Sequence, residues 1–137
     1  MTYTRSKSVG LRLGFRSGLE EKVAAQLVAA QVEVKYETEK IEYFTPLTNH
    51  KYCPDFILPN GIIIETKGRF MLADRKKHIL IQKQHPSLDI RFVFSRSRTP
   101  ITKGSPTTYG DWCTTHDFQY ADTLIPPAWL IAKGKKR

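Results

Sequence analysis

The chain contains very little cysteine. Cys53 and Cys113 are the only two in 137 residues, and they lie far apart and outside any CxxC pattern. This excludes the disulfide framework of a small secreted domain and indicates a reducing compartment. The four histidines follow no zinc-finger spacing, so a Cys/His metal site is not expected either.

Long apolar segments and acidic residues are also scarce. No stretch is long and apolar enough to span a bilayer, and the N-terminus has no apolar signal-peptide core. Lysine and arginine number 22 against 13 aspartates and glutamates, which gives a net charge of +9. Such an excess favours a polyanionic partner, and without a membrane segment it favours nucleic acid over a membrane. The length of 137 residues is most simply one domain with a real core.

A β-hairpin is expected over residues 52–67. Its turn is Pro59-Asn60-Gly61, in which proline fixes the first φ, asparagine suits the second position and glycine takes the left-handed third. A three-residue loop pairs position 58 with position 62, and therefore Asp55 with Glu65. A two-residue loop of Asn60-Gly61 would move Asp55 to the opposite face. We prefer the three-residue loop, because the fixed φ of proline is then useful.

Two opposed acids in one hairpin need an explanation, because like charges that face each other destabilise a sheet. Mg²⁺ binds one or two carboxylates together with substrate phosphate oxygens. Asp55 and Glu65 would hold such an ion, and Lys67, on the strand face of Glu65, would place an amine near the attacking water or the phosphate. The alternative is an ordinary hairpin with solvated acids. The apolar run Ile62-Ile63-Ile64 indicates a strand buried on both faces and favours the metal site.

Helices and strands are predicted on both sides of this hairpin. We expect a helix from Ser17, its N-cap, to about Gln31, with Glu20 completing a capping box, so that Glu20 on this evidence has a structural role. The other predicted elements are a strand over 32–37 continued by 40–44, a connector over 46–51, a helix from Asp74 as N-cap to Gln84, a strand over 89–95, a helix over 106–116 capped by Ser105, and a packed segment over 124–131. This order predicts an α/β or α+β domain with a mixed sheet flanked by helices.

Basic residues gather in three segments that could contact a phosphate backbone. Residues 1–16 are either a disordered tail or an arm that folds onto DNA. Cations at the start of the helix from position 74 oppose the helix dipole, which a phosphate partner would explain as well as a solvated charge run does. The loop over 96–103 is rich in Ser, Thr, Gly and Pro. The candidate DNA contacts are Arg5, Lys7, Arg12, Arg16, Arg75, Lys76, Lys77, Arg96, Arg98 and Lys103.

Six motifs taken together resemble one known family. They are Phe15-Arg16-Ser17-Gly18-Leu19-Glu20, Pro54-Asp55-Phe56, Leu58-Pro59-Asn60-Gly61, Glu65-Thr66-Lys67-Gly68, Asp74-Arg75-Lys76-Lys77-His78 and Lys103-Gly104-Ser105-Pro106-Thr107. From about Phe15 to Trp129 the chain is similar to endonuclease I of podophages, a Holliday-junction resolvase with a restriction-endonuclease-like PD-(D/E)xK core. The nuclease domain would span 17–131, between a basic arm over 1–16 and a basic tail over 132–137.

The resemblance implies an enzyme that cuts four-way and other branched DNA with Mg²⁺ or Mn²⁺, using one or two ions per active site. It implies a domain-swapped homodimer in the cytoplasm of an infected bacterial host, with each site taking its helix glutamate from one chain and its hairpin from the other. By position, Asp55, Glu65 and the Thr66 carbonyl would bind metal. Glu20 would complete a second ion site with Asp55, and Lys67 would orient or activate the attacking water. Glu20, Asp55, Glu65 and Lys67 are thus the expected catalytic residues.

One position departs from the family pattern. A further glutamate is expected in the strand after the first helix, where this chain has Lys35. Glu33 and Glu37 share its strand face by parity and could take over an acidic role. The alternatives are that this role is dispensable or that activity is altered, and position 35 is left out of the expected site.

Two other functions fit part of the sequence. A non-catalytic architectural DNA-binding protein explains the net charge equally well, but it gives no reason for Asp55 to oppose Glu65. A sequence-specific nuclease with the same core fold explains the acids. It would need a base-reading module, and none is recognisable in the sequence.

Overall fold

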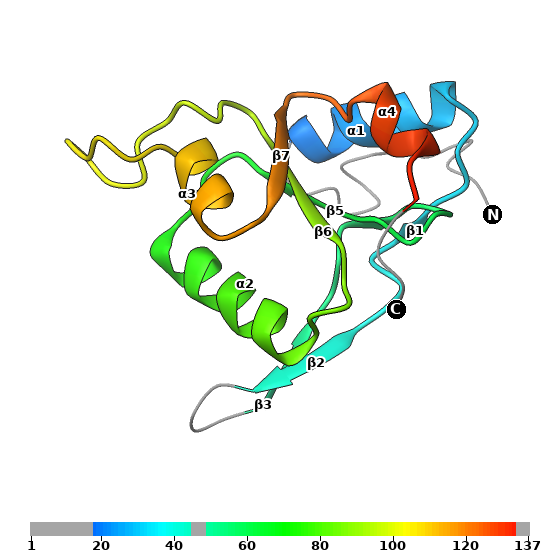
Figure 1. Cartoon of the computed structure of the whole chain (residues 1–137). Coiled ribbons are helices and arrows are strands. Elements are labelled where there is room, and N and C mark those ends of the chain that lie inside the picture. The colour runs from blue at the N-terminus through cyan, green and yellow to red at the C-terminus, as the bar shows by residue number, and fades with distance from the viewer. Residues whose placement is uncertain (1–17, 45–48, 134–137) are drawn as a thin grey trace.

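A five-stranded sheet crosses the molecule between two pairs of helices (Figure 1). The computed structural model describes residues 18–44 and 49–133. In chain order the elements are α1 (Gly18–Ala29), β1 (Lys35–Tyr36), β2 (Ile41–Phe44), β3 (Asn49–Tyr52), β4 (Phe56–Ile57), β5 (Ile63–Lys67), α2 (Leu72–Gln84), β6 (Ile90–Phe94), α3 (Tyr109–Thr115), β7 (Gln119–Asp122) and α4 (Pro127–Ile131). The predicted mixed sheet flanked by helices is confirmed.

The sheet has the order β1-β4-β5-β6-β7. β4 pairs antiparallel with both β1 and β5, whereas β5, β6 and β7 run parallel to one another. Parallel neighbours need long crossovers, which α2 and α3 supply. β2 and β3 form a separate antiparallel pair. None of the helices in the described parts of the chain is long and apolar enough to cross a bilayer.

The hairpin between β4 and β5 has the predicted three-residue loop. Ile57 pairs with Ile63, and the Leu58 amide donates to the Ile62 carbonyl at 2.9 Å. Gly61 closes the turn at φ +90°, a backbone conformation that L-residues rarely adopt. The register that places Asp55 opposite Glu65 is therefore confirmed.

Asn60 in this turn also connects it to the C-terminal helix. Its Oδ1 accepts from the Ile62 amide at 3.1 Å, as expected for an asparagine in a turn. Its Nδ2 donates to the carbonyls of Trp129 and Ala132 at 2.9 and 2.7 Å. The hairpin loop is thus held against the C-terminal end of α4.

The core consists of two clusters, one on each face of the sheet. Ile62 and Ile64 pack against α1 and α4, together with Val23, Leu27 and Trp129. Ile63 points the other way, into an aromatic cluster covered by α2 and α3. All three isoleucines of the run 62–64 are fully buried, which confirms a strand buried on both faces.

Two helix starts differ from the prediction. α2 begins after Met71, and Asp74 is not its N-cap but its third residue, where it accepts from the Met71 amide. α3 is capped by Thr108, whose side chain accepts from Asp111, and not by Ser105. In both helices the aspartate closes a capping box from inside the first turn. Ser17, the predicted cap of α1, lies outside the described residues.

Two strands were missing from the sequence prediction. β3 occupies the second half of the segment expected to be a connector over 46–51, and β2 pairs with it and does not continue β1. β7 was not predicted because most of its residues are exposed and show no apolar alternation. It is an edge strand, so its pairing with β6 and not its own apolar pattern defines it.

His78 on α2 makes the stability of this fold dependent on pH. It is fully buried among the rings of Tyr52, Phe92 and Phe118, and neither ring nitrogen has a hydrogen-bond partner among the described residues. Burial, followed by the charges of Lys67 and Lys77, lowers the pKa of His78 well below 6.5. The unfolded state therefore binds more protons below pH 6.5, and stability is lost as the pH falls.

We expect the His78→Phe variant to gain stability relative to wild type as the pH falls from 7 to 5, because phenylalanine has no proton to bind. The gain should grow by at most about 1.4 kcal/mol for each pH unit below 6.5. Urea denaturation at the two pH values measures it. A difference that is the same at both values would contradict the prediction.

Candidate active site

The sheet register brings three acidic residues into one row. The Glu37 amide donates to the Asp55 carbonyl at 3.3 Å, which continues the pairing of Tyr36 with Phe56 by one residue. Asp55 in turn continues the pairing of Phe56 with Ile64 toward Glu65. The row therefore crosses three neighbouring segments and meets β5 at its middle residue, Glu65.

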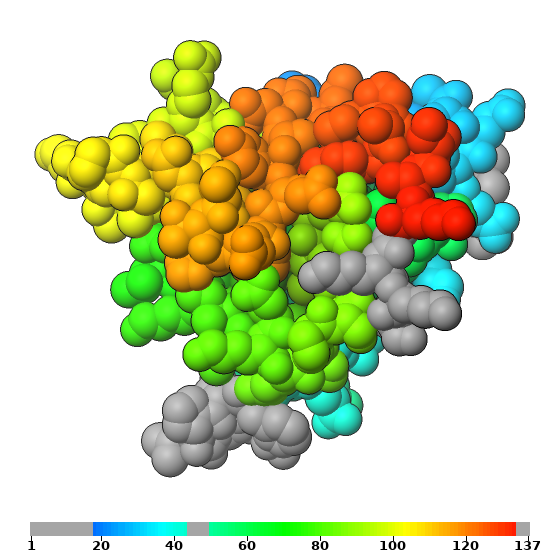
Figure 2. Space-filling view, viewed as in Figure 1, coloured from blue at the N-terminus to red at the C-terminus, as the bar shows by residue number. Residues whose placement is uncertain are grey.

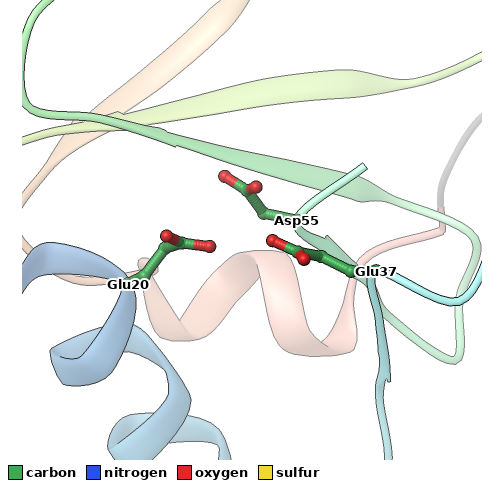
Figure 3. A group of neighbouring side chains, drawn as sticks. All are labelled: Glu20, Glu37 and Asp55. Carbon is green, nitrogen blue, oxygen red and sulfur yellow. The ribbon is translucent and has the colours of Figure 1, made fainter. Parts of the chain in front are cut away.

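Three carboxylates converge at one end of this row, as Figure 3 shows. Glu20 from the first turn of α1, Glu37 and Asp55 each offer an oxygen, and these atoms lie within 4.8 Å of one another. Glu20 and Asp55 are 3% and 2% exposed, so water screens their charges poorly. We call Glu20, Glu37 and Asp55 the acidic cluster.

Neighbouring hydroxyl and amide groups hold this cluster in place. Asp55 Oδ2 accepts from both the amide and the hydroxyl of Thr66, each at 2.9 Å. Glu20 Oε2 accepts from the Tyr36 hydroxyl at 2.9 Å. Burial and then the carboxylate of Glu20, with a further contribution from Glu37, raise the pKa of Tyr36, so its hydroxyl keeps its proton and remains a donor.

Glu37 joins the cluster because the chain leaves regular strand geometry beside it. β1 ends at Tyr36, and Glu37 has φ +50°, in the left-handed region. Lys35 is exposed, and its ammonium lies 3.1 Å from Glu39. Glu33 is also exposed. Of the two acids that share the strand face of position 35, Glu37 is therefore the one the fold brings beside Glu20 and Asp55.

Glu65 belongs to a second group of side chains next to the cluster. Its Oε2 accepts from the buried Tyr52 hydroxyl at 2.7 Å. Its Oε1 lies 3.8 Å from the Lys67 ammonium, which lies 3.3 Å from Asp74 Oδ1. These four residues connect β3, β5 and α2 around one partly buried amine.

The predicted opposition of Asp55 and Glu65 holds for the backbone but only partly for the carboxylates. β4 begins at Phe56, so strand alternation does not govern the Asp55 side chain, which turns to Thr66 and the acidic cluster. The two acids remain coupled. Burial first, and then the charge of Asp55, raise the pKa of Glu65 to about 8, although Lys67, Tyr52 and Lys77 oppose the shift.

The residues present fit a hard divalent cation. The acidic cluster offers only carboxylate oxygens, the ligands that Mg²⁺ and Mn²⁺ prefer. Three such groups this close repel one another in a poorly solvated site, and a cation between them would offset the repulsion. Thr66 was predicted to bind the metal through its carbonyl, and this stays a prediction. In the structure its amide and hydroxyl donate to Asp55 and hold that carboxylate in place.

The predicted phosphate contacts have different surroundings. Arg75 is buried, and its Nη1 donates to the Phe70 carbonyl at 2.6 Å and to the Ile101 carbonyl at 3.4 Å. This internal role explains a cation at the start of α2 without a phosphate. Lys77 is half-buried, with its ammonium 5.3 Å from the ring centre of Tyr52.

The remaining predicted contacts are on the surface or outside the described residues. Lys76, Arg96, Arg98 and Lys103 are exposed. The last three lie on the loop between β6 and α3, which projects from the body of the molecule in Figures 1 and 2 (yellow). The others lie in the segment before Gly18, which the structure does not describe: Arg5, Lys7, Arg12 and Arg16.

Comparison with known proteins connects this site to a family. The whole chain, residues 1–137, matches the family model described as phage endonuclease I. It is 56% identical over 122 residues to Endonuclease I of Escherichia phage T7, which covers 89% of this chain and 82% of that protein. It is 57% identical over 122 residues to Endodeoxyribonuclease 1 of Enterobacteria phage T3, with 89% and 80% covered. Both relatives carry the names of endonucleases.

The raised pKa of Glu65 predicts a pH dependence of stability opposite to that of His78. Between the unfolded value of 4.5 and the folded value of about 8, the folded state binds the extra proton, so stability falls as the pH rises. Above pH 6.5 the contribution of His78 fades, because the unfolded histidine loses its proton there. We expect metal-free wild type to lose ~2 kcal/mol between pH 6.5 and 8 through Glu65 alone.

The Glu65→Gln variant should lose this dependence, because glutamine resembles the protonated acid and still accepts from Tyr52. Urea denaturation in a chelating buffer measures both proteins across the pH range. The same slope in the variant as in wild type would show that Glu65 is already ionised in the folded state.

Proposed function

We propose that this chain, which belongs to the phage endonuclease I family and is therefore an endonuclease, is a metal-dependent endodeoxyribonuclease that resolves four-way (Holliday) and other branched DNA junctions. The family supports the cleavage of nucleic acid by the chain. The choice of branched DNA and the need for a metal rest on the resemblance of the motifs and on the chemistry of the site. In this proposal the enzyme acts inside the infected host cell.

The single observation that carries the proposal is the convergence of Glu20, Glu37 and Asp55 beside Glu65 and Lys67. Mg²⁺ or Mn²⁺ would be held by Asp55 together with Glu65 or with the other two acids, which provides for one or two ions. An ion held there supplies a more acidic water molecule and a positive charge against the phosphate oxygens.

The chain's own residues prepare this site for a phosphodiester. Lys67 brings an ammonium group to the edge of the acids, where it would orient a water molecule or stabilise charge on the phosphate. Tyr52 fixes one oxygen of Glu65, and Thr66 fixes one oxygen of Asp55. These contacts preorganise the carboxylates, so little reordering is needed when substrate binds.

Branch selectivity is best explained by shape and two copies of the site. In a symmetric homodimer each protomer presents one site to the same junction, so that two strands are cut near the branch. The exposed cations Lys76, Arg96, Arg98 and Lys103, with the basic arm over 1–16, would contact phosphates. Arg75 is left out of this surface because its guanidinium is bound internally.

We expect alanine at Glu20, Asp55, Glu65 or Lys67 to reduce cleavage of a labelled four-way junction by on the order of a hundredfold or more, because each removes a metal ligand or the positioned amine. Binding of the junction should remain, since phosphate contacts lie elsewhere. Cleavage with and without Mg²⁺, beside a gel-shift assay, measures both. Undiminished cutting by all four variants would exclude this site.

Glu37 and Glu33 give a matched pair within the same experiment. Glu37→Ala should lose activity, about tenfold or more, because it removes a carboxylate from the cluster. Glu33→Ala should keep its activity, because it removes only an exposed acid of the same segment.

The rival functions have their own outcomes. No metal-dependent cutting would favour an architectural protein, and discrete cuts in linear duplex of mixed sequence would favour a sequence-specific nuclease.

A domain-swapped homodimer predicts complementation between inactive chains. Glu20 and Asp55 already meet within the single chain, so a swap would exchange α1 between two copies of the same arrangement. If each site takes its α1 from one chain and its hairpin from the other, a Glu20→Ala chain paired with an Asp55→Ala chain contains one intact site. Differently tagged chains, purified as heterodimers, should therefore recover up to half of the wild-type sites and nick single strands. Without swapping every site carries a lesion, so no recovery would argue against it.

A further inference from the structure

Lys67 lies between two carboxylates, but only one of them belongs to the proposed catalytic site. Its ammonium is 3.3 Å from Asp74 Oδ1 and 3.8 Å from Glu65 Oε1. The first distance is within hydrogen-bond range, whereas the second is too long for one. Asp74, and not Glu65, is therefore the residue that holds the amine.

Asp74 is itself held at the start of α2. Its other oxygen, Oδ2, accepts from the Met71 amide at 3.1 Å in a capping box. The turn beside it is anchored by Arg75, whose amide donates to the Met71 carbonyl and whose guanidinium donates to the carbonyl of fully buried Phe70. One carboxylate thus links a fixed helix end to the lysine.

We propose that Asp74 is a positioning residue for Lys67, an inference that rests on the nuclease function proposed above. A lysine side chain loses rotamer freedom when it is ordered, and this loss disfavours any single position of the amine. Asp74 orders the side chain before substrate arrives, with the ammonium 3.8 Å from Glu65 Oε1. Asp74 is not one of the acids of the cluster, so in this proposal it acts on the reaction only through Lys67.

The chain offers a matched control in α3. Asp111 occupies the same third position of its helix, and its carboxylate accepts from the Thr108 amide at 3.1 Å, as Asp74 does from Met71. Within residues 18–44 and 49–133, no salt bridge of Asp111 is present, and the residue is exposed. In Asp74→Asn and in Asp111→Asn the side-chain oxygen can still accept from the helix-capping amide. Only Asp74→Asn replaces the oxygen that accepts from the Lys67 ammonium with an amide nitrogen, which cannot accept.

The test compares the two variants with wild type under single-turnover conditions on a four-way junction. We expect Asp74→Asn to lower the rate of the cutting step about tenfold or more, with junction affinity unchanged, and Asp111→Asn to leave both unchanged. Melting temperatures of the two variants should fall by similar amounts. Equal cutting by both variants, a weakened affinity as the only effect of Asp74→Asn, or failure of Asp74→Asn alone to fold would overturn the proposal.

A second measurement does not depend on cutting. The ammonium signal of Lys67 in nitrogen-15 NMR, identified by its loss in Lys67→Ala, should be sharp in wild type and in Asp111→Asn and broadened in Asp74→Asn. If wild type fails to cut junctions, the nuclease proposal fails while this signal still tests the positioning of Lys67. A Lys67 signal unaffected by Asp74→Asn would overturn the positioning role by itself.

Discussion

The mutual repulsion of buried carboxylates is the constraint on which the rest of this structure depends. Glu20, Asp55 and Glu65 are almost fully buried, and Glu37 lies beside them. Their closeness destabilises the protein unless protons, hydrogen-bond donors or a cation offset it. Tyr36, Tyr52 and Thr66 donate hydrogen bonds to Glu20, Glu65 and Asp55, and yet burial first, and then the charge of Asp55, raise the pKa of Glu65. Residues that are arranged for binding or catalysis commonly lower the stability of the folded protein.

The sheet can hold these carboxylates close together because its two faces carry different parts of the site. α1 brings Glu20 to one face, where Asp55 and Glu37 turn to meet it. α2 covers the other face and brings Asp74 to Lys67, while β3 brings Tyr52 to Glu65. Each face has its own apolar cluster, so the carboxylates are fixed by packing on both sides of β5. Asp55 and Lys67 therefore lie on opposite faces of the sheet, and each is held by the apolar cluster of its own face.

The sequence revealed those parts of the site that local chemistry determines. The loop Pro59-Asn60-Gly61 specifies its own length, and the length sets the register that aligns Asp55 with Glu65. The role of Glu37 could only be offered as an alternative, since it depends on a left-handed residue after a two-residue strand. The start of α2 was misplaced because methionine is an unusual N-cap and the aspartate that signals a cap sits three positions inside. Asp74 was therefore assigned to the helix alone, and its contact with Lys67 was not foreseen.

Lys35 shows that the residue type at one position of a motif does not by itself decide how many acids the site contains. A cation in place of an expected carboxylate would weaken a metal site if it pointed into it, because it would compete with the ion for the same acids. Here Lys35 is exposed and lies against Glu39. The left-handed turn at Glu37 instead carries that carboxylate to Glu20 and Asp55, which keeps three acids together. Three carboxylates therefore meet around one point without an acid at position 35, because the end of a short strand decides which neighbouring residue reaches that point.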